Sequence, residues 1–398
     1  METDVLVVGA GVIGLSIAIA ILEQDPAIRL LVLEKENSLG KHASGRNSGV
    51  IHAGFYYSPD SLKAKFCASG NQALRQLCKE HGIPIRTVGK VVVAKNEREL
   101  NQLVLLFNRG LENGVQLELL PASQLPKYEP LAQTFGSFIW SPTTAVSDPD
   151  LVLSALHKSA EMLGAKFIFG ERPVIDQDTS IALVNGETIS FKHIINAAGT
   201  QADRIAHQFG FGRNLAMLPF MGVYRSVNHS KLPLATLVYP VPDPSNPFLG
   251  VHLTISVHGR VKIGPTAIPI LNREQYHLFN SWNVRDIGTS VAGFSAMFRG
   301  DFHNLAKLAF NELPKVFLKR LVRDAATLVP EVKKVSGWEP IPPGIRAQLV
   351  NLKTGELISD FILQGDAHST HVLNAVSPGW TAAIPFGRYV AERVLKVM

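Results

Sequence analysis

The sequence has little of what marks membrane-spanning, disulfide-rich or disordered proteins. It contains two cysteines among 398 residues, 18% of its residues are charged, and no low-complexity block interrupts it. Hydrophobic residues make up 46% of the chain, as in ordinary globular proteins. A chain of this length can bury a large core and has room for two domains.

The scarcity of cysteine excludes a disulfide framework. Cys67 and Cys78 lie eleven residues apart on one predicted helix. At the helical rise this is roughly 16 Å, which is too far for a bridge. We therefore expect a reducing, cytoplasmic environment. The first predicted strand begins at residue 4, so no signal or transit peptide is expected.

Long apolar runs and runs of like charge are also absent. The longest apolar stretch, residues 12–22, is too short to span a bilayer. The formal charge of +6 suits an anionic substrate or an anionic membrane surface, but the Lys and Arg residues are scattered and predict no nucleic-acid partner. The protein is expected to be soluble, or peripheral on the inner face of the cell membrane. No metal site is expected, and the oligomeric state stays open.

A glycine-rich turn near the N-terminus is the most informative feature that is present. The apolar run at residues 4–8 leads into Gly9-Ala10-Gly11-Val12-Ile13-Gly14, a helical pattern follows to residue 24, and a second apolar run at residues 30–33 ends in Glu34. This order is the fingerprint of a dinucleotide-binding βαβ unit. The glycines let the backbone approach a pyrophosphate at the positive end of the helix. Glu34 is expected to accept hydrogen bonds from a ribose hydroxyl.

The rest of the chain alternates between helical and strand-like patterns. An Asn185-Gly186 pair predicts a hairpin, and the apolar run 193–196 reads as a central parallel strand whose end faces a ligand. Helices are predicted at residues 61–81, 97–113, 150–163 and 385–397, and over 285–327 with a division near Pro314. Two interleaved domains follow: residues 1–81, 146–215 and 341–398 bind the nucleotide, and residues 82–145 and 216–340 bind the substrate.

Two later stretches add a resemblance to a known family. Asn196-Ala197-Ala198-Gly199 and Ser377-Pro378-Gly379-Trp380-Thr381 are similar to flavin-contact motifs of the FAD-dependent oxidoreductases of the D-amino-acid oxidase family. The resemblance covers essentially the whole chain. It implies FAD as the cofactor and an α/β fold. In that fold, a Rossmann-like FAD-binding domain of the glutathione-reductase type is interleaved with an α+β substrate domain built on a mainly antiparallel sheet.

The resemblance also implies which residues bind FAD. They come from the glycine turn, the acidic strand end with the loop after it, and the two flavin motifs, together with one later valine: Gly9, Gly11, Val12, Ile13, Gly14, Glu34, Lys35, Ser44, Arg46, Asn47, Ser48, Gly49, Val174, Ala198, Gly199, Ser377, Pro378, Gly379, Trp380 and Thr381.

Within the family, the chain is most similar to members that oxidise L-2-hydroxyglutarate to 2-oxoglutarate. One departure is found in residues 219–224, where Met221 and Val223 replace an expected arginine and an expected acidic residue. This departure argues against a substrate role for that loop. The similarity is carried by residues 45–57, 61–65, 239–242, 250–254, 344–348 and 360–361.

A 2-hydroxy dicarboxylate needs cationic and hydroxyl groups that hold its carboxylates. Arg346 is the leading candidate, because a guanidinium binds a carboxylate in a two-pronged geometry that lysine cannot reproduce; the alternative is pairing with a structural acid. Tyr239 resembles the family tyrosine that supports the same carboxylate, and a packing role is equally compatible. Tyr57 and Lys63 are candidates for the second carboxylate.

Oxidation of an alcohol also needs a group that removes the hydroxyl proton. Histidine suits this role because its ordinary pKa is about 6.5. His52 lies in the loop expected beside the flavin and is the first candidate. His252 lies in a predicted strand of the substrate domain and is the second.

These residues predict an enzyme that transfers a hydride from the alpha carbon of L-2-hydroxyglutarate to FAD and passes the electrons to a membrane quinone or to oxygen. An amino-acid or sarcosine-type flavin oxidase is the alternative enzyme, and a flavin-bound surface protein without turnover is an alternative of another class. Residues 291–328 interleave apolar residues with Lys and Arg, which favours contact with a membrane surface. Helices packed on the substrate domain would show the same spacing.

Overall fold

The glycine-rich turn lies at the centre of a mostly parallel sheet. The computed structural model describes residues 1–398 except 177–179, 185, 244–247 and 277–282, and except the side chains of 301–309 and 311. Strand β1 (Glu2–Val8) runs parallel to β2 (Leu30–Glu34) on one side and to β12 (Glu187–Asn196) on the other. Both β1 and β2 are almost entirely buried, as expected of parallel strands covered by helices on both faces.

This first sheet has eight strands within the described residues. Its order is β10-β11-β12-β1-β2-β9, with β20 beside β12 and β19 beside β20. Residue 185 of the predicted hairpin lies outside the described part of the chain, but β11 and β12 pair in antiparallel fashion on either side of it. The remaining strands are β9 (Lys166–Phe169), β10 (Val174–Asp176), β11 (Ile181–Val184), β19 (Ile362–Gly365) and β20 (Ser369–Leu373).

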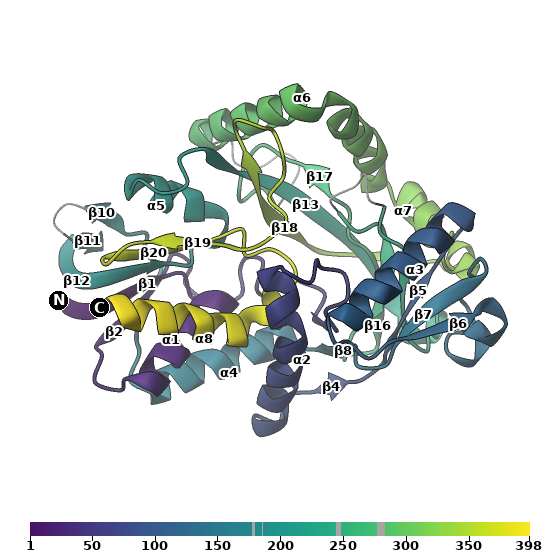
Figure 1. Ribbon diagram of the computed structural model, residues 1–398, viewed down its shortest axis with the longest axis horizontal. Coiled ribbons are helices and arrows are strands. Elements are labelled where there is room, and N and C mark those ends of the chain that lie inside the picture. The colour runs from purple at the N-terminus through teal and green to yellow at the C-terminus, as the bar shows by residue number, and fades with distance from the viewer. Residues whose placement is uncertain (177–179, 185, 244–247, 277–282) are drawn as a thin grey trace.

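Four helices cover this sheet and enclose its core. Helix α1 (Val12–Gln24) is nearly all apolar and buried, and it packs on α4 (Pro149–Met162) and α8 (Gly379–Val397). Helix α2 (Leu62–Glu80) packs on α8 from the other side (Figure 1). Cys67 and Cys78 both lie in α2 and are free and buried. The helices predicted at 61–81 and 150–163 agree with α2 and α4 to within one residue at each end.

The predicted start of the last helix was wrong. A start at Pro385 was expected, whereas α8 begins at Gly379 and contains Pro385 in its interior. Proline lacks an N–H group and normally ends a helix. Here the first turns are held by packing: a Cβ atom on Gly70 of α2 would lie 2.1 Å from the Thr381 carbonyl oxygen. Tertiary contact therefore outweighs the local signal.

A second, mainly antiparallel sheet lies beside the first. Its order is β17-β13-β16-β15-β14-β5-β7-β6, with β18 paired to β13, so that nine strands take part within the described residues. Among the described strands of this sheet, β5 and β14 pair in parallel and the other pairs are antiparallel. The strands are β5 (Lys90–Val93), β6 (Glu118–Pro121), β7 (Ser137–Ser141), β13 (Leu215–Asn228), β14 (Leu237–Pro240), β15 (His252–Ile255), β16 (Arg260–Gly264), β17 (Ile268–Pro269) and β18 (Glu339–Asn351).

Helices α6 and α7 lie over the second sheet, and α6 crosses β13 and β18 (Figure 1). The predicted division near Pro314 is confirmed, because the 3-10 helix η4 (Leu313–Val316) separates the two. In the described part of the chain, no helix combines the length and the apolar character needed to cross a bilayer. The helices here are α3 (Glu97–Glu112), α6 (Val284–Glu312) and α7 (Leu318–Ala325).

Short elements complete the chain. The described residues also form a three-stranded sheet of order β3-β8-β4. Its strands and the remaining helices are β3 (Val50–Ile51), β4 (Ile85–Arg86), β8 (Ala145–Ser147), α5 (Ala202–Gln208), η1 (Ala122–Lys127), η2 (Gly199–Gln201), η3 (His229–Lys231) and η5 (Pro330–Lys334). The α/β class and the pairing of a mostly parallel with a mainly antiparallel sheet agree with the expectation. The predicted domain boundaries stay predictions.

Candidate active site

A cavity of about 570 Å³ reaches from the β1–α1 turn to strands of both sheets. One end is lined by Gly9, Gly11 and Glu34, and the other by Tyr239, His252 and Arg346. A cavity of this size is in the range that holds small ligands and cofactors. The two ends have different chemistry and are described in turn.

Glycine is required at two positions of the β1–α1 turn. Gly9 has a φ of +109°, and a Cβ atom there would lie 2.6 Å from the Ala197 carbonyl oxygen. On Gly14 a Cβ atom would lie 1.9 Å from the Gly9 carbonyl oxygen. The turn therefore folds tightly on itself and on the end of β12, and it leaves the N-terminus of α1 facing the cavity.

Polar side chains fix the backbone around this turn. The Val12 N–H donates to Ser44 Oγ at 3.0 Å, and the Ala10 N–H donates to Glu34 Oε2 at 3.0 Å. Glu34 Oε1 accepts from the Glu36 N–H at 3.0 Å, and the side chain also lines the cavity, so its remaining lone pairs are available to a ligand. This end of the cavity has the N-terminal amides and the acidic side chain that a dinucleotide requires.

Most of the residues predicted to bind FAD line the cavity. Of the other four, Gly14 and Gly49 are buried in backbone contacts, and Thr381 Oγ1 accepts a hydrogen bond from the His52 N–H at 3.1 Å. Val174 lies between two lining residues, but its own side chain is 69% exposed. The lining residues are Gly9, Gly11, Val12, Ile13, Glu34, Lys35, Ser44, Arg46, Asn47, Ser48, Ala198, Gly199, Ser377, Pro378, Gly379 and Trp380.

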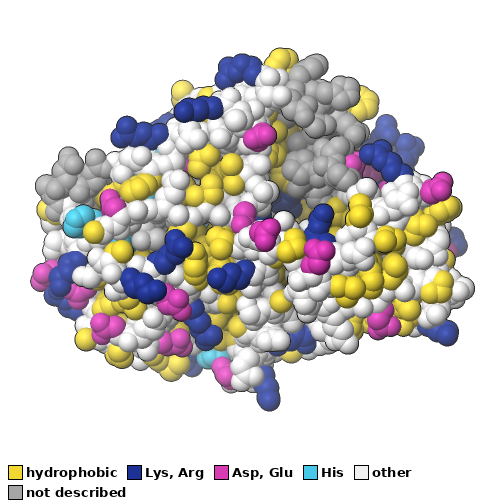
Figure 2. All heavy atoms as spheres, viewed as in Figure 1, with side chains coloured by type: hydrophobic (Ala, Val, Ile, Leu, Met, Phe, Trp, Pro, Cys, Tyr) yellow, Lys and Arg dark blue, Asp and Glu magenta, His cyan; other side chains and the backbone are white. Residues whose placement is uncertain are grey.

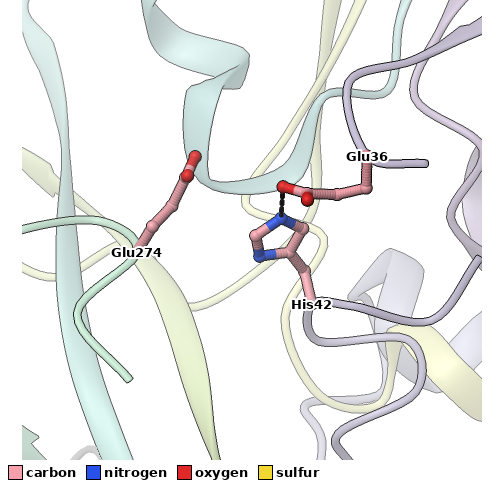
Figure 3. A group of neighbouring side chains, drawn as sticks. All are labelled: Glu36, His42 and Glu274. Carbon is pink, nitrogen blue, oxygen red and sulfur yellow. Dashed lines mark hydrogen bonds and ion pairs between the residues drawn. The ribbon is translucent and has the colours of Figure 1, made fainter. Parts of the chain in front are cut away.

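A charged cluster lies beside the same end of the cavity. Glu36 and His42 come from the loop after β2, Glu274 comes from the segment after β17, and their side chains lie close together (Figure 3). Three such groups can hold a metal ion, but the Lys35 ammonium already lies among them, 2.6 Å from Glu36, 3.0 Å from Glu274 and 2.5 Å from His42 Nε2. Lys35 holds the pKa of Glu36 down at about 2, and burial lowers the pKa of His42. The cluster is therefore an ion network with its own internal cation.

Arg346 lies at the opposite end, on β18, in register with Phe220 of β13. Its guanidinium carbon lies 4.8 Å from the ring centre of Phe248. Among the described residues, no carboxylate lies within ion-pair distance of Arg346, and burial lowers its pKa. An arginine keeps its charge even so, and a buried cation of this kind is suited to an anionic ligand. The buried Glu312 opposes this shift in pKa, and it is itself paired with Lys315. The alternative role, pairing with a structural acid, is not tested by these contacts.

Tyr239 and His252 stack on neighbouring strands, with ring centres 3.9 Å apart. His252 Nδ1 donates to the Gly250 carbonyl oxygen at 2.9 Å, which leaves Nε2 as the nitrogen with a free lone pair. Burial lowers the pKa of His252 to about 3 and, with the charge of Lys90, holds the pKa of His52 well below 6.5. His52 Nδ1 is buried without a hydrogen-bond partner in the described structure. Both histidines line the cavity, and their lowered pKa favours the neutral form at pH 7.

Tyr57 and Lys63 lie near this end without lining the cavity. Burial raises the pKa of Tyr57 well above 10, against the opposing effect of Ser377. The Lys63 side chain is buried at the start of α2, with its ammonium 5.6 Å from the Phe361 ring centre. Burial lowers the pKa of Lys63 to about 8, against the opposing charge of Asp360. The substrate contacts predicted for both stay predictions.

Three features at this end were not assigned from the sequence. Tyr224 and Thr266 line the cavity, and burial raises the pKa of Tyr224 to about 12. Lys90 is fully buried nearby; the one available signal was a lysine at the head of an otherwise apolar strand. Met221 is buried among Ile268, Ile270 and Ile345, so an apolar cluster occupies the place of the expected charged residue.

Comparison with known proteins gives the family. Residues 4–393 match the model of the DAO family, described as FAD dependent oxidoreductase. Two solved structures share the fold: L-alpha-glycerophosphate oxidase from Mycoplasma pneumoniae (24% identity, TM-score 0.74, 100% of this chain and 94% of that one) and glycine oxidase from Geobacillus kaustophilus (20%, 0.73, 99% and 95%).

Curated relatives are closer in sequence. L-2-hydroxyglutarate dehydrogenase of Indibacter alkaliphilus is 34% identical, with 100% of both chains covered. The protein of the same name from Escherichia coli K12 is 32% identical over 98% of this chain and 93% of its own. The mitochondrial one from Bos taurus is 33% identical over 98% and 88%. The chain therefore belongs to the DAO family of FAD-dependent oxidoreductases.

Proposed function

We propose that this protein oxidises L-2-hydroxyglutarate to 2-oxoglutarate with FAD. The observation that carries the proposal is the pairing of two ends in one cavity, a dinucleotide turn at Gly9–Gly14 and a cationic end at Arg346 beside two neutral histidines. The names of the relatives, which match over nearly the full chain, support the same substrate.

The residues present fit FAD. A Cβ atom would clash at Gly9 and Gly14, so the turn keeps the close backbone approach that a pyrophosphate needs. Gly9, Gly11, Glu34 and the 377–380 loop would hold the cofactor. When bound, FAD accepts the hydride from the alpha carbon of the substrate.

The side chains at the other end position the substrate and move its proton. Arg346 binds the alpha-carboxylate in a two-pronged contact, and Tyr239 supports it. His52, whose side chain lines the cavity, receives the hydroxyl proton on its imidazole ring. His252 is the second candidate, since the Gly250 carbonyl orients its ring with Nε2 free. Both are neutral at pH 7 because burial lowers their pKa, so the base form is available.

Anaerobic addition of substrate to the yellow protein tests the proposal. L-2-hydroxyglutarate is expected to bleach the flavin absorbance. D-2-hydroxyglutarate should be far slower, because Arg346 and His52 together admit one face of the alpha carbon. Equal rates with the D enantiomer, or faster bleaching by lactate, would contradict the dicarboxylate assignment. Faster bleaching by glycine, sarcosine or D-alanine would favour an amino-acid oxidase, and no bleaching by any of them would favour a binding protein.

The electron acceptor is proposed to be a membrane quinone or oxygen, and an exposed apolar surface supports contact with a membrane. Phe298, Phe310, Leu313 and Phe317 are 54%, 80%, 49% and 71% exposed, and Arg299 and Lys319 are exposed nearby. Lys and Arg side chains lie over α6 at the upper edge of the face in Figure 2, next to hydrophobic ones. Aromatic and cationic side chains together suit an anionic headgroup region.

Part of the predicted membrane segment is not available for this role. Leu321 is fully buried, and Phe294 packs against Phe220 with ring centres 5.8 Å apart. Phe302, Leu305 and Leu308 lie outside the described side chains. Flotation with vesicles containing anionic lipid tests the contact. Protein that stays at the bottom of the gradient at low salt would leave α6 and α7 as packed helices only.

A further inference from the structure

Lys90 is a fully buried lysine on the sheet that carries Tyr239 and His252. Lysine is among the residues least often found fully buried. Residues in register share a face of the sheet, and Lys90 pairs with Leu237 while Val92 pairs with Tyr239. Tyr239 lies on β14, between Lys90 on β5 and His252 on β15. The Lys90 side chain therefore lies on the same face of the sheet as Tyr239, on the opposite side of Tyr239 from His252.

Three aromatic rings surround the end of this side chain. The Nζ atom lies 4.5 Å from the ring centre of Phe55, 4.6 Å from that of Tyr56 and 4.7 Å from that of Tyr239. It has no hydrogen-bond partner in the described structure, and no carboxylate there forms an ion pair with it. Contacts with ring faces compensate a buried ammonium only in part. Burial accordingly lowers the pKa of Lys90 to about 7, although the Cys67 thiol opposes the shift.

In the part of the chain that the structure describes, the groups that face Lys90 include no carboxylate. The Cys67 thiol on α2 raises the pKa of Lys90. The charges of Lys90 and His252 lower the pKa of His52, and those of Lys90 and Arg346 lower the pKa of His252. The hydroxyls of Tyr56 and Tyr239 are also buried without partners in the described residues. Glu312 acts on Arg346 and is already paired with Lys315. Around Lys90 itself, the described groups are cationic or proton-donating, and none supplies the negative charge that would stabilise a buried ammonium. A bound dicarboxylate would supply that charge.

We propose, on the basis of the function proposed above, that Lys90 takes up a proton when a dicarboxylate binds, and that the resulting buried charge strengthens anion binding. The neutral amine at Nζ accepts one proton from the buffer and becomes an ammonium, and no other bond is made or broken. Lys90 does not line the cavity. It is therefore a positioning residue that acts on the anion across the Tyr239 ring without touching it.

Calorimetric titration of the oxidised, FAD-loaded protein with 2-oxoglutarate tests this step. Titrations at about pH 8 in phosphate and in Tris, which differ in ionisation enthalpy, give the number of protons taken up. One pH unit above the pKa of the free lysine, uptake approaches about 0.9 proton per site in the wild-type protein. In Lys90→Met most of this uptake is lost, and Lys63 accounts for any remainder.

The affinity supplies a second readout that a merely structural role would not change. The Kd of the wild-type protein rises by up to about tenfold per pH unit above neutrality, because fewer lysines are protonated before binding. In Lys90→Met the Kd depends little on pH. At neutral pH it is weaker by about ten- to a hundred-fold, the effect of one charge at roughly 6 to 10 Å with an effective dielectric constant of about 20.

The controls separate charge from folding. Lys90→Met replaces an unpaired buried ammonium with an apolar chain of similar length, so its Tm is expected to equal or exceed that of the wild type. Lys166→Met removes the same charge from an exposed position on β9 and should behave as wild type. If Lys90→Met is insoluble, the titration of the wild-type protein in two buffers still shows whether a proton is taken up when 2-oxoglutarate binds.

Two outcomes would overturn the inference, and they are distinguishable. Binding of 2-oxoglutarate without proton uptake, in a protein whose flavin L-2-hydroxyglutarate reduces, refutes the role of Lys90 and leaves the proposed function intact. Proton uptake and affinity that stay at the wild-type values in Lys90→Met also refute the role of Lys90 and leave the proposed function intact. A wild-type protein that neither binds 2-oxoglutarate nor is reduced by L-2-hydroxyglutarate overturns the proposed function, and this inference with it.

Discussion

Replacing Arg346 tests how the proposed substrate is held. Its guanidinium lies over the Phe248 ring, at 4.8 Å, and pairs with no carboxylate in the described structure. Its donors are therefore available to a ligand. Arg346→Lys keeps the positive charge and removes the planar pair of donors, so it isolates geometry from charge.

The expected loss follows from the strength of a charge-assisted contact. Such a hydrogen bond contributes about 1.5–3 kcal/mol, so Arg346→Lys should lower kcat/KM about ten- to a hundred-fold. Most of the loss should appear in KM, because the carboxylate is held in both the ground state and the transition state. Arg346→Met also removes the charge and should lose more. Steady-state kinetics with an artificial electron acceptor, together with stopped-flow flavin reduction, give both constants.

A matched control exists on α8. Arg393 also lies over an aromatic ring, with its guanidinium 4.6 Å from the ring centre of Tyr389, but it is exposed. Arg393→Lys should leave kcat/KM unchanged. A loss under about threefold in Arg346→Lys, or an equal loss in the control, would assign the carboxylate contact to another residue.

Three further predictions concern the base and the glycine turn. His52→Ala should slow flavin reduction on the order of a hundred-fold while FAD stays bound, and a large loss in His252→Ala with none in His52→Ala would reverse the assignment. Because the pKa of His52 is lowered, acid should slow flavin reduction only well below pH 6.5, and an acid midpoint at or above that value would contradict a neutral buried base. Gly14→Ala should yield protein with little FAD and a lower Tm, because its Cβ atom would lie 1.9 Å from a carbonyl oxygen. The matched Gly288→Ala, on an exposed helical position with open space around it, should keep its FAD absorbance, and equal behaviour of the two variants would refute the steric reasoning.

The sequence was sufficient wherever the deciding interactions are local. The bounds of α2 and α4 follow from apolar periodicity and from the capping residues Ser61 and Asp148, whose side chains accept backbone N–H groups of the first turn. The glycine turn could also be predicted from the sequence, because the tight turn itself requires glycines at this spacing. The start of α8 was not, because packing against Gly70, a residue distant in sequence, keeps the turns before Pro385 helical.

Features that depend on several distant segments could not be predicted. The environment of Lys90 comes from a loop at residues 55–56 and from Tyr239, which only the folded sheets bring together. Lys35 was expected near the cofactor, but its place among Glu36, His42 and Glu274 depends on a segment more than 200 residues away. The choice between His52 and His252 is likewise set by contacts across strands and loops that no local pattern encodes.

The ion network around Lys35 has a consequence for how long the protein keeps its cofactor. The Glu274 carboxylate receives Lys35, Arg172 and Gln201 from three separate segments, and all three line the dinucleotide end of the cavity. Tyr276, two residues further on, hydrogen-bonds His42 and lies under the Arg46 guanidinium. Ionic contacts therefore tie the 274–276 segment to residues at the dinucleotide end of the cavity. Because salt screens such contacts, FAD is expected to dissociate faster at high salt, which the rate of flavin release into solution would measure.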